Sequence, residues 1–169
     1  MPRKSSLSIP RKQLVDTQKK IILVIYHSQG GTMKLMARRL AEGAAREDNV
    51  AVVLKKAAEA TIDDLLQCNG IAIGSPEYFG TMAGMIKDFF DRTYEAAKDK
   101  TIGLPFVVFV CAGNDGRGAI TQIERIVAGY KWKKVKEHIR VTGPPTEQDL
   151  AALEELGQTL AAGVDFGIF

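Results

Sequence analysis

The sequence lacks both long hydrophobic runs and a large charge of either sign. No apolar segment approaches the ~18 residues that a bilayer-spanning helix needs. The formal net charge is only +3 in 169 residues, which argues against a nucleic-acid-binding surface. The basic opening segment, residues 1–20, contains no apolar stretch of the kind found in signal peptides. We therefore expect a cytoplasmic protein that binds neither membranes nor nucleic acid.

Cysteine and histidine are scarce as well, with two of each. Cys68 and Cys111 lie far apart and beside apolar runs, so they show neither CxxC nor metal-ligand spacing. We interpret them as buried free thiols, which suit a reducing compartment. His27 and His138 have no sequence neighbours that indicate a catalytic Ser or Asp partner. We therefore predict no metal site and no catalytic side chain.

What the sequence does contain is a regular succession of apolar and amphipathic segments. Its apolar runs show no polar alternation, which is typical of parallel strands buried on both faces. The predicted strands span 20–26, 50–54, 71–73, 105–111 and 135–141, and the predicted helical segments span 32–48, 62–66, 82–97, 119–130 and 147–162. Thr61 is the candidate N-cap of the second helical segment, with Asp64 at its third position. Right-handed crossovers turn this order into a three-layer α/β/α sandwich with a five-stranded parallel sheet. We expect this domain over residues 20–169, after a flexible basic tail over residues 1–19.

Glycines and hydroxyl groups follow the first predicted strand. Residues 27–33 read His-Ser-Gln-Gly-Gly-Thr-Met and lie between a buried strand and a helix N-terminus. The hydroxyls of Ser28 and Thr32, the glycine backbone and the free helix amides form an anion site suited to a phosphate monoester. The loop lacks the lysine of triphosphate-binding loops and the GxGxxG spacing of dinucleotide-binding folds. An ordinary glycine turn capped by Thr32 is the alternative.

Two further loops leave predicted strands at the same edge of the sheet. Residues 74–82 place the adjacent aromatics Tyr78 and Phe79 between glycines, and a flat ring there suits stacking on a planar heterocycle. Residues 111–118 are rich in glycine and can aim several N–H groups at one place. Ligands of doubly wound sheets bind at the carboxyl ends of the strands. The three loops together therefore predict a pocket for a planar ring with a phosphate tail.

These motifs resemble those of the flavodoxin-like superfamily. The similarity rests on residues 26–33, 36–44 and 74–84 and extends over about residues 20–163. It is strongest to FMN-dependent NAD(P)H:quinone oxidoreductases of the tryptophan-repressor-binding-protein type and to NADPH-dependent FMN reductases. The resemblance implies a flavodoxin-like fold with strand order 2-1-3-4-5, FMN as cofactor and NAD(P)H as reductant. The cofactor-binding residues that it implies are Ser28, Gln29, Gly30, Gly31, Thr32, Met33, Pro76, Glu77, Tyr78, Phe79, Gly80, Cys111, Ala112, Gly113, Asn114, Asp115 and Gly116.

Three functions fit this pattern. The first is an oxidoreductase that passes electrons from NAD(P)H through FMN to a quinone or a similar small acceptor. The second is a flavodoxin-type carrier of single electrons, which the net charge of +3 disfavours because such carriers resemble one another in being acidic around the flavin. The third is a non-enzymatic binding module, because Asn114, Asp115 and Arg117 replace the Thr-Gly and histidine usual in the quinone reductases.

Self-association is a further implication of the resemblance, since quinone reductases of this type form oligomers. We expect a homo-oligomer, with Trp132, Phe166 and Phe169 as candidate contact residues. Packing of the C-terminal tail onto its own subunit is the alternative.

Overall fold

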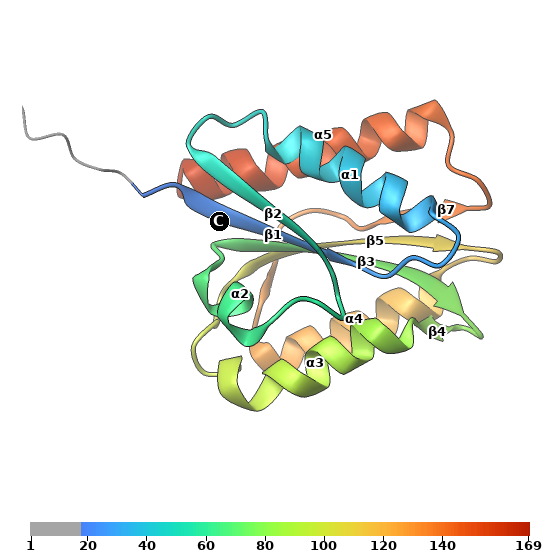
Figure 1. Ribbon diagram of the computed structural model, residues 1–169, viewed down its shortest axis with the longest axis horizontal. Helices are drawn as coiled ribbons and strands as arrows, with labels where there is room; N and C mark the ends of the chain where they lie inside the picture. The colour runs from blue at the N-terminus through green and yellow to red at the C-terminus, as the bar shows by residue number, and fades with distance from the viewer. Residues whose placement is uncertain (1–17) are drawn as a thin grey trace, which may run out of the picture.

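The computed structural model describes residues 18–169, and most of the predicted basic tail lies outside the described residues. These residues form twelve elements, most of which are labelled in Figure 1. In chain order they are β1 (Lys20–Tyr26), α1 (Thr32–Ala44), β2 (Val50–Lys56), α2 (Ile62–Gln67), β3 (Gly70–Tyr78), β4 (Thr81–Met82), α3 (Gly84–Ala97), β5 (Pro105–Ala112), α4 (Arg117–Tyr130), β6 (Lys133–Lys134), β7 (Ile139–Thr142) and α5 (Glu147–Asp165). Over residues 18–169, no helix combines the length and the apolar character needed to cross a membrane.

One central sheet organises the chain. Its strands lie in the order β2-β1-β3-β5, and β6 and β7 share the position beyond β5. These strands all run parallel, whereas β4 pairs antiparallel with the end of β3. In the numbering of the five predicted strands this order is 2-1-3-4-5, so the predicted flavodoxin-like fold is confirmed. The sheet nevertheless has seven strands rather than five.

Helices cover both faces of the sheet. Helices α1 and α5 lie on one face, and α2, α3 and α4 lie on the other (Figure 1). Along β3, Ile71 and Ile73 belong to the core beneath α2–α4, whereas Ala72 belongs to the core beneath α1 and α5. Because both faces of each central strand are buried, these strands are apolar at every position rather than at alternate ones.

Strand β3 extends beyond its predicted end. The prediction stops it at residue 73, yet the strand continues through Pro76 to Tyr78. The carbonyl oxygen of Gly74 accepts a hydrogen bond from the His27 amide (3.2 Å) on the β1 side. Alternation along the strand places the nitrogen of Pro76 on that same side, where β1 has already ended at Tyr26. The missing amide of Pro76 therefore removes no ladder hydrogen bond.

A tight hairpin connects β3 to β4. Tyr78 pairs with Thr81, and the two residues between them, Phe79 and Gly80, have φ values of 52° and 72°. Positive φ at both central positions is typical of a type I′ turn. The prediction began the next helix at residue 82, but Met82 belongs to β4, and α3 begins at Gly84.

The last predicted strand is interrupted by a bulge. From Lys134 to Ile139 the chain advances five residues, while its partner β5 advances only three. His138 fills the gap, because its Nδ1 accepts a hydrogen bond from the Val108 amide (3.2 Å). Its Nε2 lies 2.9 Å from Oε1 of Glu124 on α4. A side chain thus supplies the acceptor that a continuous strand would have provided with its backbone.

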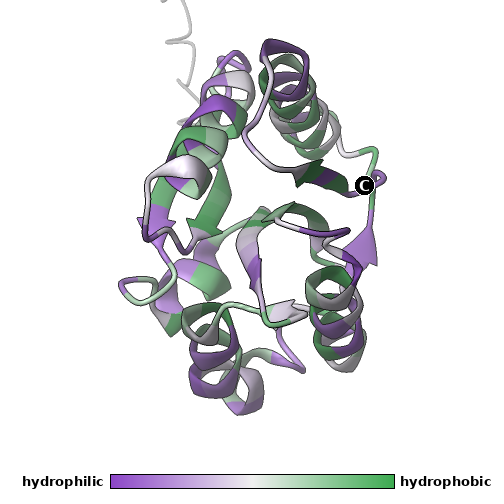
Figure 2. Cartoon of the chain, turned by 90° about the vertical axis from the view of Figure 1, so that its right-hand side faces the viewer, coloured by the Kyte–Doolittle hydropathy of each residue, from purple (hydrophilic) through white to green (hydrophobic). Residues whose placement is uncertain are grey.

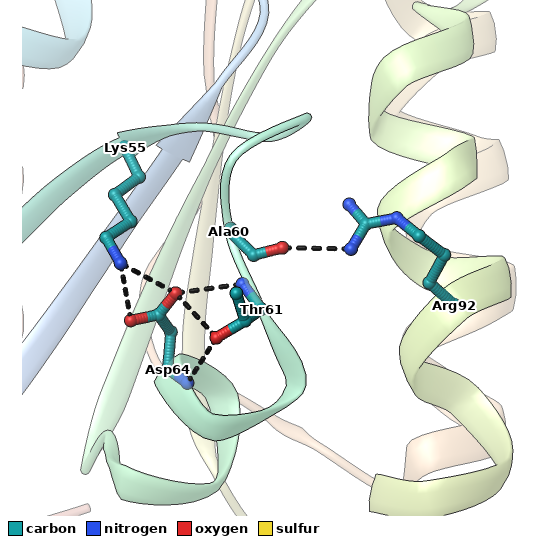
Figure 3. A network of polar contacts seen from close by, with 5 residues as sticks. All are labelled: Lys55, Ala60, Thr61, Asp64 and Arg92. Atoms are coloured by element: carbon teal, nitrogen blue, oxygen red, sulfur yellow. Dashed lines mark hydrogen bonds and ion pairs between the residues drawn. The ribbon is translucent and has the colours of Figure 1, made fainter.

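The loop between β2 and α2 is fastened by polar contacts that Figure 3 shows. Thr61 and Asp64 form the predicted cap of α2 as a complete capping box. Nζ of Lys55 lies 2.8 Å from Oδ1 of Asp64, and Nη1 of Arg92 donates to the carbonyl oxygen of Ala60 (2.9 Å). The loop is thereby held between β2 and α3.

Trp132 does not provide the exposed contact that we expected. Its side chain is buried, and its Nε1 donates to Oγ1 of Thr101 (2.8 Å). The indole packs on the ring of Tyr130, with 4.6 Å between the ring centroids. Lysines flank Trp132 in the sequence, but a large apolar ring that finds a partner for its N–H is stabilised by burial.

Candidate functional site

A cleft of about 340 Å³ opens at the carboxyl ends of the central strands, the end of the sheet that faces the viewer in Figure 2. It is lined by Ser28, Gln29, Gly30, Thr32, Met33, Pro76, Glu77, Tyr78, Cys111, Ala112, Gly113, Gly143 and Pro144. The structure therefore brings residues of all three predicted loops into one cavity. Their roles in cofactor binding stay a prediction.

The N-terminus of α1 enters the cleft without a side-chain cap. Its N-cap residue is Gly31, with φ 97°, and its first turn holds no acidic residue. Helices α2 and α5, in contrast, begin with complete capping boxes. Oγ of Ser28 accepts a hydrogen bond from the Gly31 amide (3.1 Å), and Thr32 is the first helical residue rather than the cap. The α1 amides and the positive end of the helix dipole are thus left for an external anion.

Glu77 links two of the loops. Its Oε2 accepts a hydrogen bond from the Ala119 amide at the start of α4 (3.0 Å). The carboxylate therefore occupies the N-terminus of α4, where it offsets the helix dipole. Sequence reasoning placed Glu77 beside a flavin ring. In the structure Glu77 lines the cleft, and its carboxylate accepts a hydrogen bond at the start of α4.

The third loop is held by β7. Nη1 of Arg140 donates to the carbonyl oxygen of Asp115 (2.8 Å), and Oγ1 of Thr142 donates to that of Asn114 (2.9 Å). The Asp115 carboxylate accepts a hydrogen bond from the Arg117 amide (3.0 Å). These contacts turn the middle of the loop toward β7 and leave its start, Ala112 and Gly113, at the cleft.

Some predicted site residues lie outside the cleft wall. They are Gly31, Phe79, Gly80, Asn114, Asp115 and Gly116. Gly31 and Gly116 act as the N-caps of α1 and α4, and Asn114 and Asp115 face β7. Phe79 and Gly80 form the hairpin tip, where the Phe79 side chain is completely exposed. These positions shape the loops rather than the inner surface of the cavity.

A fourth loop completes the cleft and was missed by sequence reasoning. Gly143 and Pro144, which follow β7, also line the cleft. Gly143 has φ 73°, and its amide donates to the carbonyl oxygen of Ala112 (2.9 Å). The Pro144-Pro145 turn was the available signal, because it too leaves a strand at its carboxyl end.

Both cysteines are free, and one of them lines the cleft. Sγ of Cys111 donates to the carbonyl oxygen of Gly143 (3.3 Å). Burial, assisted by the negative charge of Asp149, raises the pKa of the Cys111 thiol above its ordinary value. Burial raises the pKa of Cys68 to about 12. Both sulfurs are therefore protonated at neutral pH, which makes them poor nucleophiles.

The His138 bulge makes the stability of the folded chain depend on pH. Burial and the nearby positive charge of Lys134 lower the pKa of His138 below 6.5, although Glu124 opposes the shift. Below pH 6.5 the unfolded chain therefore binds a proton that the folded chain refuses, so stability falls as the pH drops toward the folded-state pKa. A proton on Nδ1 would also end its hydrogen bond with the Val108 amide.

We expect the free energy of unfolding of the apoprotein to decrease below pH 6.5, measured by urea denaturation at several pH values. His138→Asn, which retains an acceptor but cannot titrate, should flatten the curve in this range. Carboxyl groups such as Asp149, whose pKa is lowered by its hydrogen bonds with Thr146, titrate only at lower pH. An unchanged slope in His138→Asn would contradict this role.

Comparisons with known proteins agree with this arrangement. A family model described as NADPH-dependent FMN reductase matches residues 40–138. A flavodoxin of Aquifex aeolicus (strain VF5) is 32% identical over 159 residues, which cover 85% of this chain and 86% of the relative. An NAD(P)H dehydrogenase (quinone) of Paracoccus denitrificans (strain Pd 1222) is 31% identical over 124 residues, and the match spans 61% of this chain and 59% of that relative.

A solved structure described as a flavodoxin from the domain Archaea has the same fold. It superposes with a TM-score of 0.78 at 26% sequence identity, covering 86% of this chain and 99% of that structure. The likeness thus extends over nearly the whole of the archaeal chain.

Proposed function

Since the chain belongs to the NADPH-dependent FMN reductase family of flavodoxin-like proteins, which bind FMN, we propose that it is an oxidoreductase that takes electrons from NADPH or NADH and passes them to a quinone or a similar small acceptor. The observation that carries the proposal is the start of α1, which has no side-chain cap and lines a cleft at the carboxyl ends of four strands. A phosphate monoester and a planar ring fit such a cleft.

The phosphate end of FMN fits the first loop. The amides of Thr32 and Met33 stand at the start of α1, and the hydroxyls of Ser28 and Thr32 lie beside them. Side chains at Gly30 and Gly31 are absent, and an added Cβ would meet no atom within 4 Å at either position. The space above the loop is therefore open to a ligand, and its donors carry no competing carboxylate.

The ring end fits between the second and third loops. Tyr78 presents a half-buried ring that makes an edge contact with His27, with 6.2 Å between the centroids. Pro76 and the Cys111–Gly113 backbone line the same cavity. Bound FMN supplies the electron chemistry, so the chain has to bind, orient and shield the ring rather than provide a nucleophile. This agrees with the absence of a predicted catalytic side chain.

A flavodoxin-type electron carrier is the second candidate. The 32% identity to the Aquifex flavodoxin favours it. The net charge of +3 opposes it, because carriers of this kind rely on acidic surfaces to reach basic partners. The two candidates differ in their response to pyridine nucleotides.

We expect the protein, reconstituted with FMN and desalted, to retain a visible flavin band that NADPH or NADH bleaches under anaerobic conditions. Subsequent addition of a quinone should restore the band. A band that only dithionite bleaches, through a stable one-electron-reduced flavin, would instead identify a carrier. Loss of all flavin on desalting would favour the non-enzymatic binding module and contradict the proposal.

Self-association belongs to the same proposal. With Trp132 buried, the exposed apolar side chains near the C-terminus are Phe166 and Ile168, which are 72% and 68% exposed. Phe169 instead packs against Gly163 on α5. We propose Phe166 as a contact of a homo-oligomer, and sedimentation of Phe166→Ser tests it.

A further inference from the structure

A second cavity adjoins the cleft and shares Tyr78 with it. This cavity, here called the side groove, has a volume of about 720 Å³ and lies between the hairpin, α3 and α4. The hairpin lines one side of the groove. It contacts α4 through a hydrogen bond in which the Met82 amide donates to Oε1 of Gln122 (3.2 Å). Because Tyr78 lines both cavities, a ligand in the side groove that contacts Tyr78 would touch a residue of the ring site.

The lining of the side groove combines apolar surface with positive charge. Met82, Ile126 and the two aromatics Tyr78 and Phe79 supply the apolar part. Lys87 and Arg125 supply two cations, and no acidic residue lines the groove. Lys87 pairs with Asp91 at 2.7 Å, whereas Arg125 has no ion-pair partner within residues 18–169. The groove therefore favours an anionic ligand that also carries planar, apolar rings.

Phe79 stands at the boundary between the groove and solvent. Its φ of 52° is unfavourable for a residue with a Cβ and costs on the order of 1–2 kcal/mol. Its ring is nevertheless completely exposed, so no packing within the described chain offsets this cost. Glycine or asparagine would fit the turn better. An exposed aromatic kept in a strained turn beside a cavity is suited to covering a planar ring.

We propose that the side groove binds the reduced pyridine dinucleotide, with its diphosphate against Lys87 and Arg125 and its pyridine ring beside Tyr78 and Phe79. This rests on the proposed function, which names the nucleotide but not its site. In the reaction the dihydropyridine ring loses two electrons and one proton together to the bound flavin and becomes a pyridinium. The C–H bond of the nucleotide breaks, and a bond to the flavin forms.

Charge reversal at Arg125 tests the proposal by anaerobic stopped-flow reduction of the FMN-loaded protein. We expect Arg125→Glu to raise the half-saturating NADPH concentration at least tenfold without changing the limiting rate, because a charge-assisted hydrogen bond is worth roughly 1.5–3 kcal/mol. NADH should show the same increase, since both nucleotides carry the diphosphate. Arg38→Glu, on the opposite face of the sheet, is the matched control and should behave like the wild type.

A second readout separates this proposal from the proposed function. Calorimetric titration with NADP⁺, which cannot reduce the flavin, should show binding that Arg125→Glu weakens and Arg38→Glu does not. If NADP⁺ binds in this way but NADPH fails to bleach the wild type, the groove assignment stands and the reductase assignment fails. If NADPH bleaches both proteins with the same half-saturating concentration, the groove assignment is overturned.

Two further outcomes would also overturn it. If Arg125→Glu raises the half-saturating concentration of NADPH but not that of NADH, Arg125 contacts the 2′-phosphate rather than the diphosphate. A change in sedimenting mass of Arg125→Glu, with unchanged nucleotide affinity, would show instead that the groove is a contact between copies of this chain.

Discussion

Thr32→Glu is expected to weaken FMN binding by at least 100-fold while leaving riboflavin binding unchanged. Thr32 is the first residue of α1, whose initial turn contains no acidic side chain. A carboxylate there would occupy the uncapped amides and repel the phosphate, removing charge-assisted hydrogen bonds worth roughly 1.5–3 kcal/mol each. Riboflavin has no phosphate, so its affinity depends on the ring site alone. Fluorescence titration with the two flavins measures the difference.

The same substitution should stabilise the apoprotein. An acidic residue in the first turn interacts favourably with the helix dipole, by about 0.3–1 kcal/mol. Thr32→Gln serves as the control, because glutamine has nearly the same shape as glutamate but no charge. For this variant we expect a smaller loss of FMN affinity and no gain in stability. Equal FMN affinity in Thr32→Glu and the wild type would show that the phosphate does not lie at α1.

The layout of this site was largely predictable because it depends on local signals. Strands buried on both faces are continuous apolar runs, and parallel strands bring their carboxyl ends to one edge. The predicted loops over residues 27–33, 74–82 and 111–118 therefore had to meet, and the structure brings residues of all three into one cleft. The capping pattern Thr61-x-x-Asp64 likewise depends on neighbours three residues apart.

The features that were missed depend on neighbours far away in sequence. Pro76 predicts the end of a strand, because it has no amide to donate. It is tolerated within β3 only because β1, the neighbour on that side, has already ended. Glu77 lines the cleft, but the hydrogen bond of its carboxylate with the Ala119 amide of α4 (3.0 Å) joins residues 42 positions apart. The bulge at His138 depends on which β5 amide needs an acceptor. None of these partners can be deduced from the local pattern.

Gly43→Ala and Gly157→Ala are each expected to destabilise the protein by about 3 kcal/mol, in spite of the better helix propensity of alanine. The two glycines lie where α1 and α5 cross. An added Cβ on Gly43 would overlap the carbonyl oxygen of Glu154, and one on Gly157 would overlap that of Leu40. Because both obstacles are backbone atoms within helices, the substitution has to separate the helices and loosen the core that they share.

Each glycine contacts the partner helix at the same crossing, which leads to a sharper prediction for the double variant Gly43→Ala/Gly157→Ala. Once one methyl group has separated α1 from α5, the second has room, so the combined loss should be clearly smaller than the sum of the single losses. Gly84→Ala is the control, because an added Cβ there meets no atom within 4 Å and should change the stability by less than about 1 kcal/mol. Urea denaturation of the four variants measures each term. If the losses of stability in the double variant are fully additive, the two glycines relieve independent contacts. If the single variants lose no more stability than Gly84→Ala, the helices do not approach closely at this crossing.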